Sequence, residues 1–318
     1  MDAVGKTADS RNLIKTAAAF FVITICLYAT FSVPSSGSAY HSLGLSEGRT
    51  PIIAIIIVGF VIGSYGTIVG IGGGPLIMPI LILFYDWSTE VLVATSLFVV
   101  FLNAFSGTIG YARQKRIDYK GGMKFALAVI PGAMISGFFH HVFNIKFFDV
   151  IFGTFLIFLV AYSFLSINRV KPAQTSTGGP KRASFRHAIL VDKFGQTFDF
   201  YSNDELGVLM NLLLGFFVGF LGIGGGVFQV PILLFLLYYP THIATATSHY
   251  ITMLASLCAL IPHVFLGNVY FAKAIWMGLG VVCGAQVGAR LAPRIKSKGI
   301  IYLFIIVLLI FAVELFFK

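Results

Sequence analysis

Two five-residue glycine segments decide the fold of this chain: Gly70-Ile71-Gly72-Gly73-Gly74 and Gly222-Ile223-Gly224-Gly225-Gly226. Each interrupts a long apolar run, the first over about residues 51–84 and the second over about 206–239. A continuous helix over 51–84 would be about 51 Å long at 1.5 Å per residue, whereas the hydrocarbon core of a bilayer is roughly 30 Å thick. The glycine segments are therefore predicted to break both helices.

The two glycine segments belong to an internal duplication in which Gly70 aligns with Gly222. Residues 63–96 and 215–248 share 13 identities over 34 ungapped positions. The identities include the Ala-Thr-Ser sequences at 94–96 and 246–248. Chance similarity between glycine- and leucine-rich helices does not explain an ungapped match of both features. The chain is therefore predicted to contain two copies of one structural unit.

The composition places this unit in a membrane. The 318 residues are 58% hydrophobic and 11% charged, whereas soluble domains carry about 25% charged residues. Several apolar runs reach about 20 residues, enough for a helix to cross a bilayer. The net charge of +10 lies in the gaps between these runs, so it indicates topology and no nucleic-acid partner. Cys26, Cys258 and Cys283 lie within apolar runs and predict neither a disulfide framework nor a metal site.

The basic loops predict how the repeats are oriented. If each glycine-broken block crossed the membrane once, the basic loop 113–124 would lie outside, against the positive-inside rule. If each block instead returns to its own side, loop 113–124, segment 169–205 and residues 290–298 all lie inside. Each repeat then holds three full crossings. An odd number inverts the second repeat relative to the first, a plan that recurs in secondary transporters.

The predicted fold is an all-α polytopic membrane protein. It has two inverted repeats, each a glycine-broken helix–loop–helix hairpin plus three transmembrane helices, preceded by one extra N-terminal helix. That apolar run, over about 13–33, is long for the core of a signal peptide, which is the alternative. Alternating residues around Lys193–Gln196 predict a short β-hairpin over 188–200. The predicted units are 1–50 (N-terminal extension), 51–168 (repeat 1), 169–205 (cytoplasmic linker) and 206–318 (repeat 2).

The glycine segments also predict an anion site. Each is followed by a new helix, and Pro75 suits a first helical position. The free N–H groups and the positive dipole end of such a helix attract an anion, and glycine lets it approach the backbone. The alternative is close helix packing, which accounts for isolated glycines such as Gly132 and Gly288. The glycines expected to line the site are Gly72, Gly73, Gly74, Gly224, Gly225 and Gly226.

Polar side chains in the same apolar blocks narrow the ligand class. Their hydroxyl, amide and imidazole groups can donate to the oxygens of an oxyanion. The alternatives are helix-packing or back-bonded hydroxyls and, for the histidine, a hydrogen-bonded core residue. All twelve Asp and Glu residues fall at termini, loops or the ends of spans, which disfavours a cation substrate. The candidate substrate-binding side chains are Thr95, Ser96, Asn103, Gln229, Thr247, Ser248 and His249.

At these residues the chain resembles the TauE/SafE family of sulfite and organosulfonate exporters, also called sulfonate uptake permeases. The resemblance rests on the duplicated glycine segment with Pro79 and Pro231 downstream, and on the Ala-Thr-Ser sequences at 94–96 and 246–248. It implies secondary transport of small sulfur-containing anions across a plasma membrane, with no enzyme activity and no organic cofactor. Two features depart from the family pattern: the N-terminal extension, and Val227 at the position equivalent to Pro75.

Two other classes of function are compatible with these residues. An anion channel could use the same central constriction, and a membrane enzyme could use Cys258 or Cys283. Neither cysteine has a sequence partner that would activate a thiol, so both are expected to pack as small apolar residues. The sequence therefore favours a carrier with a small anionic substrate, a lipid environment and a cytoplasmic N-terminus, and it leaves the oligomeric state open.

Overall fold

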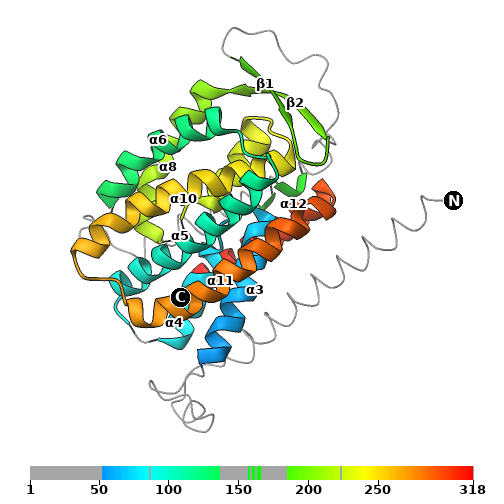
Figure 1. Cartoon of the computed structure of the whole chain (residues 1–318). Helices are drawn as coiled ribbons and strands as arrows, with labels where there is room; N and C mark the ends of the chain where they lie inside the picture. Colours follow the sequence, from blue (N-terminus) through cyan, green and yellow to red (C-terminus); the bar gives the residue numbers. More distant parts are fainter. Residues whose placement is uncertain are drawn as a thin grey trace, which may run out of the picture.

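The chain folds into a bundle of helices with a two-stranded hairpin at one end (Figure 1). This computed structural model describes residues 52–136 except 86, scattered positions between 157 and 165, and 185–317 except 223. The elements are α3 (Ile52–Val69), α4 (Gly74–Phe84), α5 (Thr89–Arg113), α6 (Tyr119–Ser136), β1 (Phe185–Val191), β2 (Thr197–Asn203), α8 (Asp204–Leu221), α9 (Gly226–Pro231), the π-helix η1 (Ile232–Leu236), α10 (Thr241–Phe265), α11 (Phe271–Leu291), the 3-10 helix η2 (Ala292–Arg294) and α12 (Ser297–Phe317).

The predicted helical membrane architecture is confirmed in its main feature. Within the described residues, four helices are long and apolar enough to cross a bilayer, namely Ile52–Val69, Thr89–Arg113, Thr241–Phe265 and Phe271–Arg294. The hairpin predicted over 188–200 is present and extends over 185–203, so the described chain is mostly, and not entirely, helical. The N-terminal helix predicted over about 13–33 and most of the apolar run at 147–168 lie outside the described residues.

The helix bounds follow the sequence duplication. Adding the 152-residue offset to α3 gives residues 204–221, which are α8, and adding it to α5 gives residues 241–265, which are α10. Adding the same offset to α4 gives residues 226–236, which are covered by α9 and η1 together. In both halves the first helix ends directly before the glycine segment and the next begins on its last glycine. The same local sequence therefore produces the same interruption twice.

The two halves interlock through small residues. Helix α3 of the first half packs on α11 of the second, and α8 of the second packs on α6 of the first. A side chain at Gly284 would overlap the carbonyl oxygen of Phe60, and one at Gly288 that of Ser64. At the other interface, a side chain at Gly132 would lie 2.5 Å from the backbone nitrogen of Phe216. The packing role predicted for Gly132 and Gly288 is confirmed, because only glycine allows these backbones to approach so closely.

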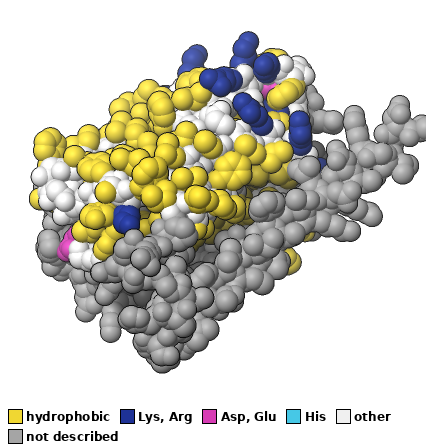
Figure 2. Space-filling model, turned by 60° about the horizontal axis from the view of Figure 1, so that its bottom comes forward, with side chains coloured by type: hydrophobic (Ala, Val, Ile, Leu, Met, Phe, Trp, Pro, Cys, Tyr) yellow, Lys and Arg dark blue, Asp and Glu magenta, His cyan; other side chains and the backbone are white. Residues whose placement is uncertain are grey.

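The surface has an apolar belt between two polar ends. In Figure 2 hydrophobic side chains cover the middle of the visible face, and most of the Lys and Arg side chains gather at one end. Loop 114–118, the hairpin and the end of α11 meet at one end of the bundle, because Gln114 Nε2 donates to the Ala289 carbonyl (2.7 Å) and its own carbonyl accepts from Lys193 N (2.9 Å). At the opposite end Trp87 stacks on Tyr85, with 4.1 Å between ring centroids, as expected of aromatic rings at a membrane interface.

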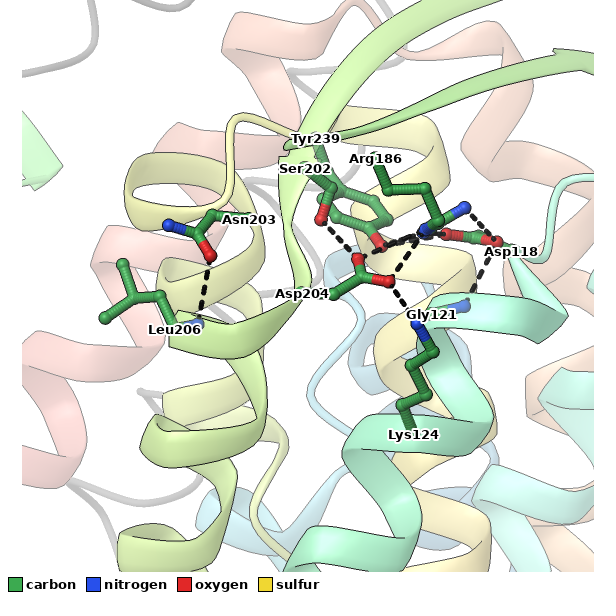
Figure 3. Close-up of polar contacts among 9 residues, drawn as sticks. All are labelled: Asp118, Gly121, Lys124, Arg186, Ser202, Asn203, Asp204, Leu206 and Tyr239. Carbon is green, nitrogen blue, oxygen red and sulfur yellow. Dashed lines mark hydrogen bonds and ion pairs between the residues drawn. The ribbon is translucent and has the colours of Figure 1, made fainter. Parts of the chain in front are cut away.

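Ion pairs hold the hairpin against the basic end of the bundle (Figure 3). Arg186 of β1 reaches two carboxylates: its Nε lies 2.9 Å from Asp204 Oδ2 and its Nη2 donates to Asp118 Oδ2. Lys124 of α6 donates to the same Asp204 oxygen at 2.8 Å, and the Tyr239 hydroxyl donates to Asp118 Oδ2 at 2.8 Å. The hairpin, α6, α8 and the loop before α10 thus share one polar network.

A second ion pair fixes the turn of the hairpin. Arg116 donates from Nε (3.0 Å) and Nη2 (2.6 Å) to Asp192 Oδ2, and both side chains are almost completely buried. The guanidinium also lies over the rings of Phe194 and Phe198, 5.4 and 5.8 Å from their centroids. Burial by itself would raise the pKa of Asp192, but hydrogen bonds from Arg116 and from backbone N–H groups of the turn outweigh it and lower the pKa.

We predict that Arg116→Leu undocks the hairpin. The substitution leaves the buried Asp192 carboxylate without its cation, which costs about 3 kcal/mol of stability, measured by thermal unfolding in detergent. Because the Asp192 pKa is lowered, the ion pair contributes its full stability to the folded protein at neutral pH. This contribution is lost only as the pH falls below the ordinary aspartate pKa of about 3.9. The control is Lys124→Gln, whose partly exposed pair with Asp204 should contribute at most about 1 kcal/mol. Equal losses in the two variants would contradict the prediction.

Candidate functional site

The backbone of the glycine segments adopts the same conformation in both halves. Gly70, Gly72 and Gly73 have φ values of 90°, 76° and 83°. Their counterparts Gly222, Gly224 and Gly225 have φ values of 68°, 70° and 77°. These left-handed angles are open to glycine and strained for other residues. A bulky side chain at Gly73 or Gly225 would therefore strain the fold whether or not a ligand binds there.

The two glycine turns meet inside the protein. A side chain at Gly226 would overlap the carbonyl oxygen of Ile71 in the first turn. A side chain at Gly72 would lie 2.9 Å from Thr252 Cγ2, and one at Gly224 would lie 3.3 Å from the same atom. Segments 152 residues apart thus touch at one place, where their non-helical backbone is buried in protein.

The duplicated serines join the turns by reciprocal hydrogen bonds. Ser96 Oγ of the first half donates to the Gly222 carbonyl at 2.9 Å, and Ser248 Oγ of the second half donates to the Gly70 carbonyl at 2.8 Å. Both serines are fully buried. Each therefore satisfies a carbonyl group that the helix break releases in the opposite half.

The duplicated threonines form a second reciprocal pair. Thr95 Oγ1 accepts from the backbone N–H of Tyr270 at 3.2 Å, and Thr247 Oγ1 accepts from that of Asp118 at 3.1 Å. Position 270 is equivalent to position 118 in the duplication. Thr95, Ser96, Thr247 and Ser248, predicted as substrate donors, are thus placed in hydrogen bonds between the halves.

The glycines open two helices whose first turns are uncapped. Gly73 precedes α4 and Gly225 precedes α9, and neither position supplies a side-chain cap. Among the described residues, no hydrogen-bond partner is found for the backbone N–H groups of Gly72, Gly73, Gly224 and Gly225. These N–H groups and the positive ends of the two helix dipoles favour a negative charge beside the turns.

A polar network adjoins the first turn. Asn103 lies with its Nδ2 3.2 Å from the position that a Cβ on Gly73 would occupy, and this buried amide nitrogen has no partner among the described residues. Thr67 Oγ1 donates to Asn103 Oδ1 at 3.3 Å and lies 3.2 Å from His249 Nε2. The Tyr111 hydroxyl donates to the Thr67 carbonyl at 2.7 Å. Two predicted residues, Asn103 beside Gly73 and His249, are therefore linked through Thr67.

The second turn has fewer polar groups around it. Gln229 lies in the first turn of α9, and its buried Nε2 has no partner among the described residues; the same is true of Thr252 Oγ1. Three residues near the turns, Thr67, Tyr111 and Thr252, were not predicted from the sequence. Thr252 has a signal in the sequence, because it lies three residues after His249 and therefore shares its helix face.

An apolar belt, helices of bilayer length and broken backbone at the centre together define a polytopic integral membrane protein. The sequence profile of the family described as sulfite exporter TauE/SafE matches residues 3–114 and 88–315. The chain belongs to this family of transmembrane transporters, as the resemblance in its sequence motifs predicts.

Similar proteins agree with this assignment. The chain is 29% identical over 273 residues to the probable membrane transporter protein YunE of Bacillus subtilis (strain 168), a match covering 84% of this chain and 97% of YunE. It is 29% identical over 260 residues to the probable membrane transporter protein MJ0441 of Methanocaldococcus jannaschii, covering 77% and 87% of the two chains. No solved structure matches.

We predict that removing the reciprocal serine hydroxyls loosens the contact between the halves. Ser96→Ala and Ser248→Ala each leave a buried glycine carbonyl without its donor, which should cost about 1 to 3 kcal/mol. The matched control is Ser256→Ala, because this buried serine donates only within its own helix, to the carbonyls of Thr252 (2.6 Å) and Met253 (3.3 Å). Thermal unfolding in detergent measures the difference. A control as destabilised as the two test variants would show that the bonds between the halves add nothing.

Proposed function

We propose that the protein is a secondary carrier for small sulfur-containing anions such as sulfite or organosulfonates. The substrate binds between the two glycine turns, near the membrane midplane, in a chain built of two inverted repeats. The observation that carries the proposal is the meeting of two uncapped helix N-termini beside the unpartnered amide nitrogen of Asn103. All these groups are hydrogen-bond donors, which is the chemistry that an oxyanion requires.

The distribution of carboxylates supports an anion over a cation. The described acidic residues lie near helix ends, in the hairpin or in the adjoining loops. None contacts the glycine turns within the described residues. Cation-coupled carriers typically place a carboxylate at their site, whereas here the nearest side chains are neutral amides, hydroxyls and an imidazole.

The family supports a sulfur oxyanion as the substrate class, since its profile carries the description of a sulfite exporter. The named relatives are described only as probable membrane transporters. A sulfite or sulfonate group presents three oxygen acceptors on one centre, and donors from two turns and Asn103 can reach such a group from several directions. Transport by this site requires neither an enzyme activity nor an organic cofactor.

The alternative is an anion channel with the same constriction. The turns touch where Gly226 packs against Ile71, and Gly224 packs against Val100 of α5. This supports the carrier, because the middle of the protein is packed and a conformational change must open it. Purified protein in liposomes tests this. Saturable exchange of labelled sulfite supports a carrier, and an unsaturated ohmic current supports a channel.

The charge distribution supports a plasma-membrane orientation with the hairpin and the N-terminus in the cytoplasm. Positively charged residues concentrate on the cytoplasmic side of membrane proteins, and loop 114–118, the hairpin and residues 289–298 share one end of the bundle. The opposite end carries the interfacial aromatic rings of Trp87 and Tyr270, whose centroids are 4.9 Å apart.

This orientation predicts opposite labelling of two exposed positions. On a background lacking cysteine, Lys193→Cys in the hairpin turn should react with a membrane-impermeant thiol reagent only after the cells are opened. Leu266→Cys, in the loop after α10, should react in intact cells. Both side chains are exposed in the structure. Labelling of the two positions from the same side would refute the inverted arrangement.

Asn103 provides the sharpest test of the site. We predict that Asn103→Leu weakens anion binding by at least tenfold, about 1.4 kcal/mol, because a donor beside Gly73 is lost. Binding to purified protein is measured against sulfite, sulfate, thiosulfate, taurine and sulfoacetate. The matched control is Asn211→Leu, since Asn211 is equally buried but donates to the Gly207 carbonyl of its own helix at 2.8 Å. Normal affinity in Asn103→Leu would remove Asn103 from the site.

A further inference from the structure

A row of polar side chains follows one buried face of α10. Its members are separated by three or four residues, which places them on the same side of a helix. All are buried, the most exposed being His242 at 9%. We call this row the polar stripe; it consists of His242, Thr245, His249, Thr252 and Ser256.

The duplication does not account for the polar stripe. The equivalent positions of α5 carry Glu90 in the first turn and then only apolar residues. The residue aligned with His249 is Leu97, which is also fully buried. Since α5 and α10 occupy corresponding places in the two halves, packing alone is satisfied by an apolar face. The polar stripe is therefore a specialisation of the second half.

The polar stripe lies directly against the first glycine turn. A side chain at Gly70 would come within 2.8 Å of Thr245 Cα, and one at Gly72 within 2.9 Å of Thr252 Cγ2. His249 is one helical turn from each of these threonines on the same face. The imidazole is therefore placed level with the turn that opens α4.

The protein provides a fitted space for the imidazole of His249. A Cβ on Gly107 would lie 2.9 Å from His249 Nε2 and would also overlap the ring carbon Cδ2, so α5 needs a glycine there. The ring meets Tyr111 edge-on at 5.6 Å between centroids, and Nε2 lies 3.2 Å from Thr67 Oγ1. Thr67 in turn donates to Asn103, which connects the histidine to the proposed anion site.

The surroundings of His249 contain no fixed charge within the described residues. Of the helices packed against α10, α5 presents Tyr111 and α3 presents Thr67. The Tyr119 ring of α6 packs on Tyr250, the residue after His249, and not on His249 itself. The charged residues of α8 lie in its first turn, and α9 has none. Those of α12, Lys298 and Glu314, lie near its two ends. On α10 itself, the other titratable side chain of the polar stripe is His242, two helical turns nearer the hairpin.

We propose that His249 is the proton-binding group of this carrier, so that one proton crosses the membrane together with one anion. The inference rests on the proposed function. An anion taken into a site without a cation loses its hydration and gains no counter-charge, which is strongly unfavourable. A proton added to the imidazole nitrogen converts a neutral ring into an imidazolium, which offsets one negative charge of the anion.

The cycle balances without any other reactant. Water on the side of entry supplies the proton as the anion binds, and the imidazolium returns it to water on the other side as the anion leaves. Histidine suits this task because its ordinary titration lies between about pH 5 and 8. The polar stripe extends from the first glycine turn to His242, near the hairpin. Its side chains supply hydrogen-bonding groups along which the proton can move between the site and that end of the bundle.

Anion affinity at two pH values tests the proposal on the purified full-length protein. The probes are sulfate, thiosulfate and taurine, whose charges are fixed over this range, together with sulfite. Proton and anion must strengthen each other's binding reciprocally. We expect the wild-type affinity to be about tenfold higher at about pH 5.5 than at about pH 8, and His249→Gln to change less than twofold. If only sulfite binds, its own titration affects the wild type and His249→Gln equally. The difference in pH dependence between the two proteins then tests the proposal.

The matched control is His187→Gln, on the exposed surface of β1, where Nε2 of the ring lies 2.6 Å from Asp199 Oδ1. It should keep the wild-type pH dependence. A pH dependence that persists in His249→Gln, or that disappears in His187→Gln, would overturn the assignment. If no probe binds at either pH, the proposed function fails and this inference fails with it. Binding that does not depend on pH in the wild type refutes proton coupling alone.

A measurement on the unmodified protein covers the case in which His249→Gln does not fold. In a weakly buffered solution near pH 7.5 with a pH-sensitive dye, saturating anion should be accompanied by uptake of up to one proton per protein. No proton uptake at full occupancy would overturn the proposal. His249→Asn is the second variant, because its smaller amide fits the space left by the ring, and it should bind the anion without taking up a proton.

Discussion

A break in a helix leaves backbone groups without their helical hydrogen bonds, and the centre of this protein is organised around that constraint. The break after α3 releases the Gly70 carbonyl and the break after α8 releases that of Gly222. Each receives its hydrogen bond from a serine in the opposite half. The donors of the following turns receive no such partner among the described residues. The backbone carbonyl groups are thus satisfied within the fold, whereas the backbone N–H groups are left beside the proposed ligand site.

The same reciprocity explains why neither half is complete alone. The serine and threonine bonds run in both directions between the halves, and α3 and α8 pack on helices of the opposite repeat. When both copies of a duplicated unit keep the same polar residue, that residue forms one hydrogen bond in each direction, so the protein gains two bonds. This accounts physically for the identity of the Ala-Thr-Ser sequences in the two halves without any contact between these residues and a substrate.

Where the halves differ, the second carries the polar groups. Its α10 has a histidine and two threonines on the face where α5 has leucine and valines. Symmetric contacts hold the bundle together, whereas the unsymmetric polar stripe contacts the turn that Asn103 adjoins. The hairpin adds a second asymmetry, since its ion pairs join the linker between the halves to α6, α8 and the start of α10 at one end of the bundle.

The sequence by itself determined the membrane class, the duplication, the two helix breaks, the family and the short hairpin. Each of these depends on composition or on residues close together in the chain. It also supplied Asn103, Gln229 and His249 as candidate polar groups. Only the tertiary structure decided that the Thr-Ser pairs bond to the opposite half, and that Thr67 links His249 to Asn103. The physical reason is that a hydroxyl in an apolar helix has the same local sequence whether it bonds to its own helix, as Ser256 does, or to a backbone 126 residues away, as Ser96 does.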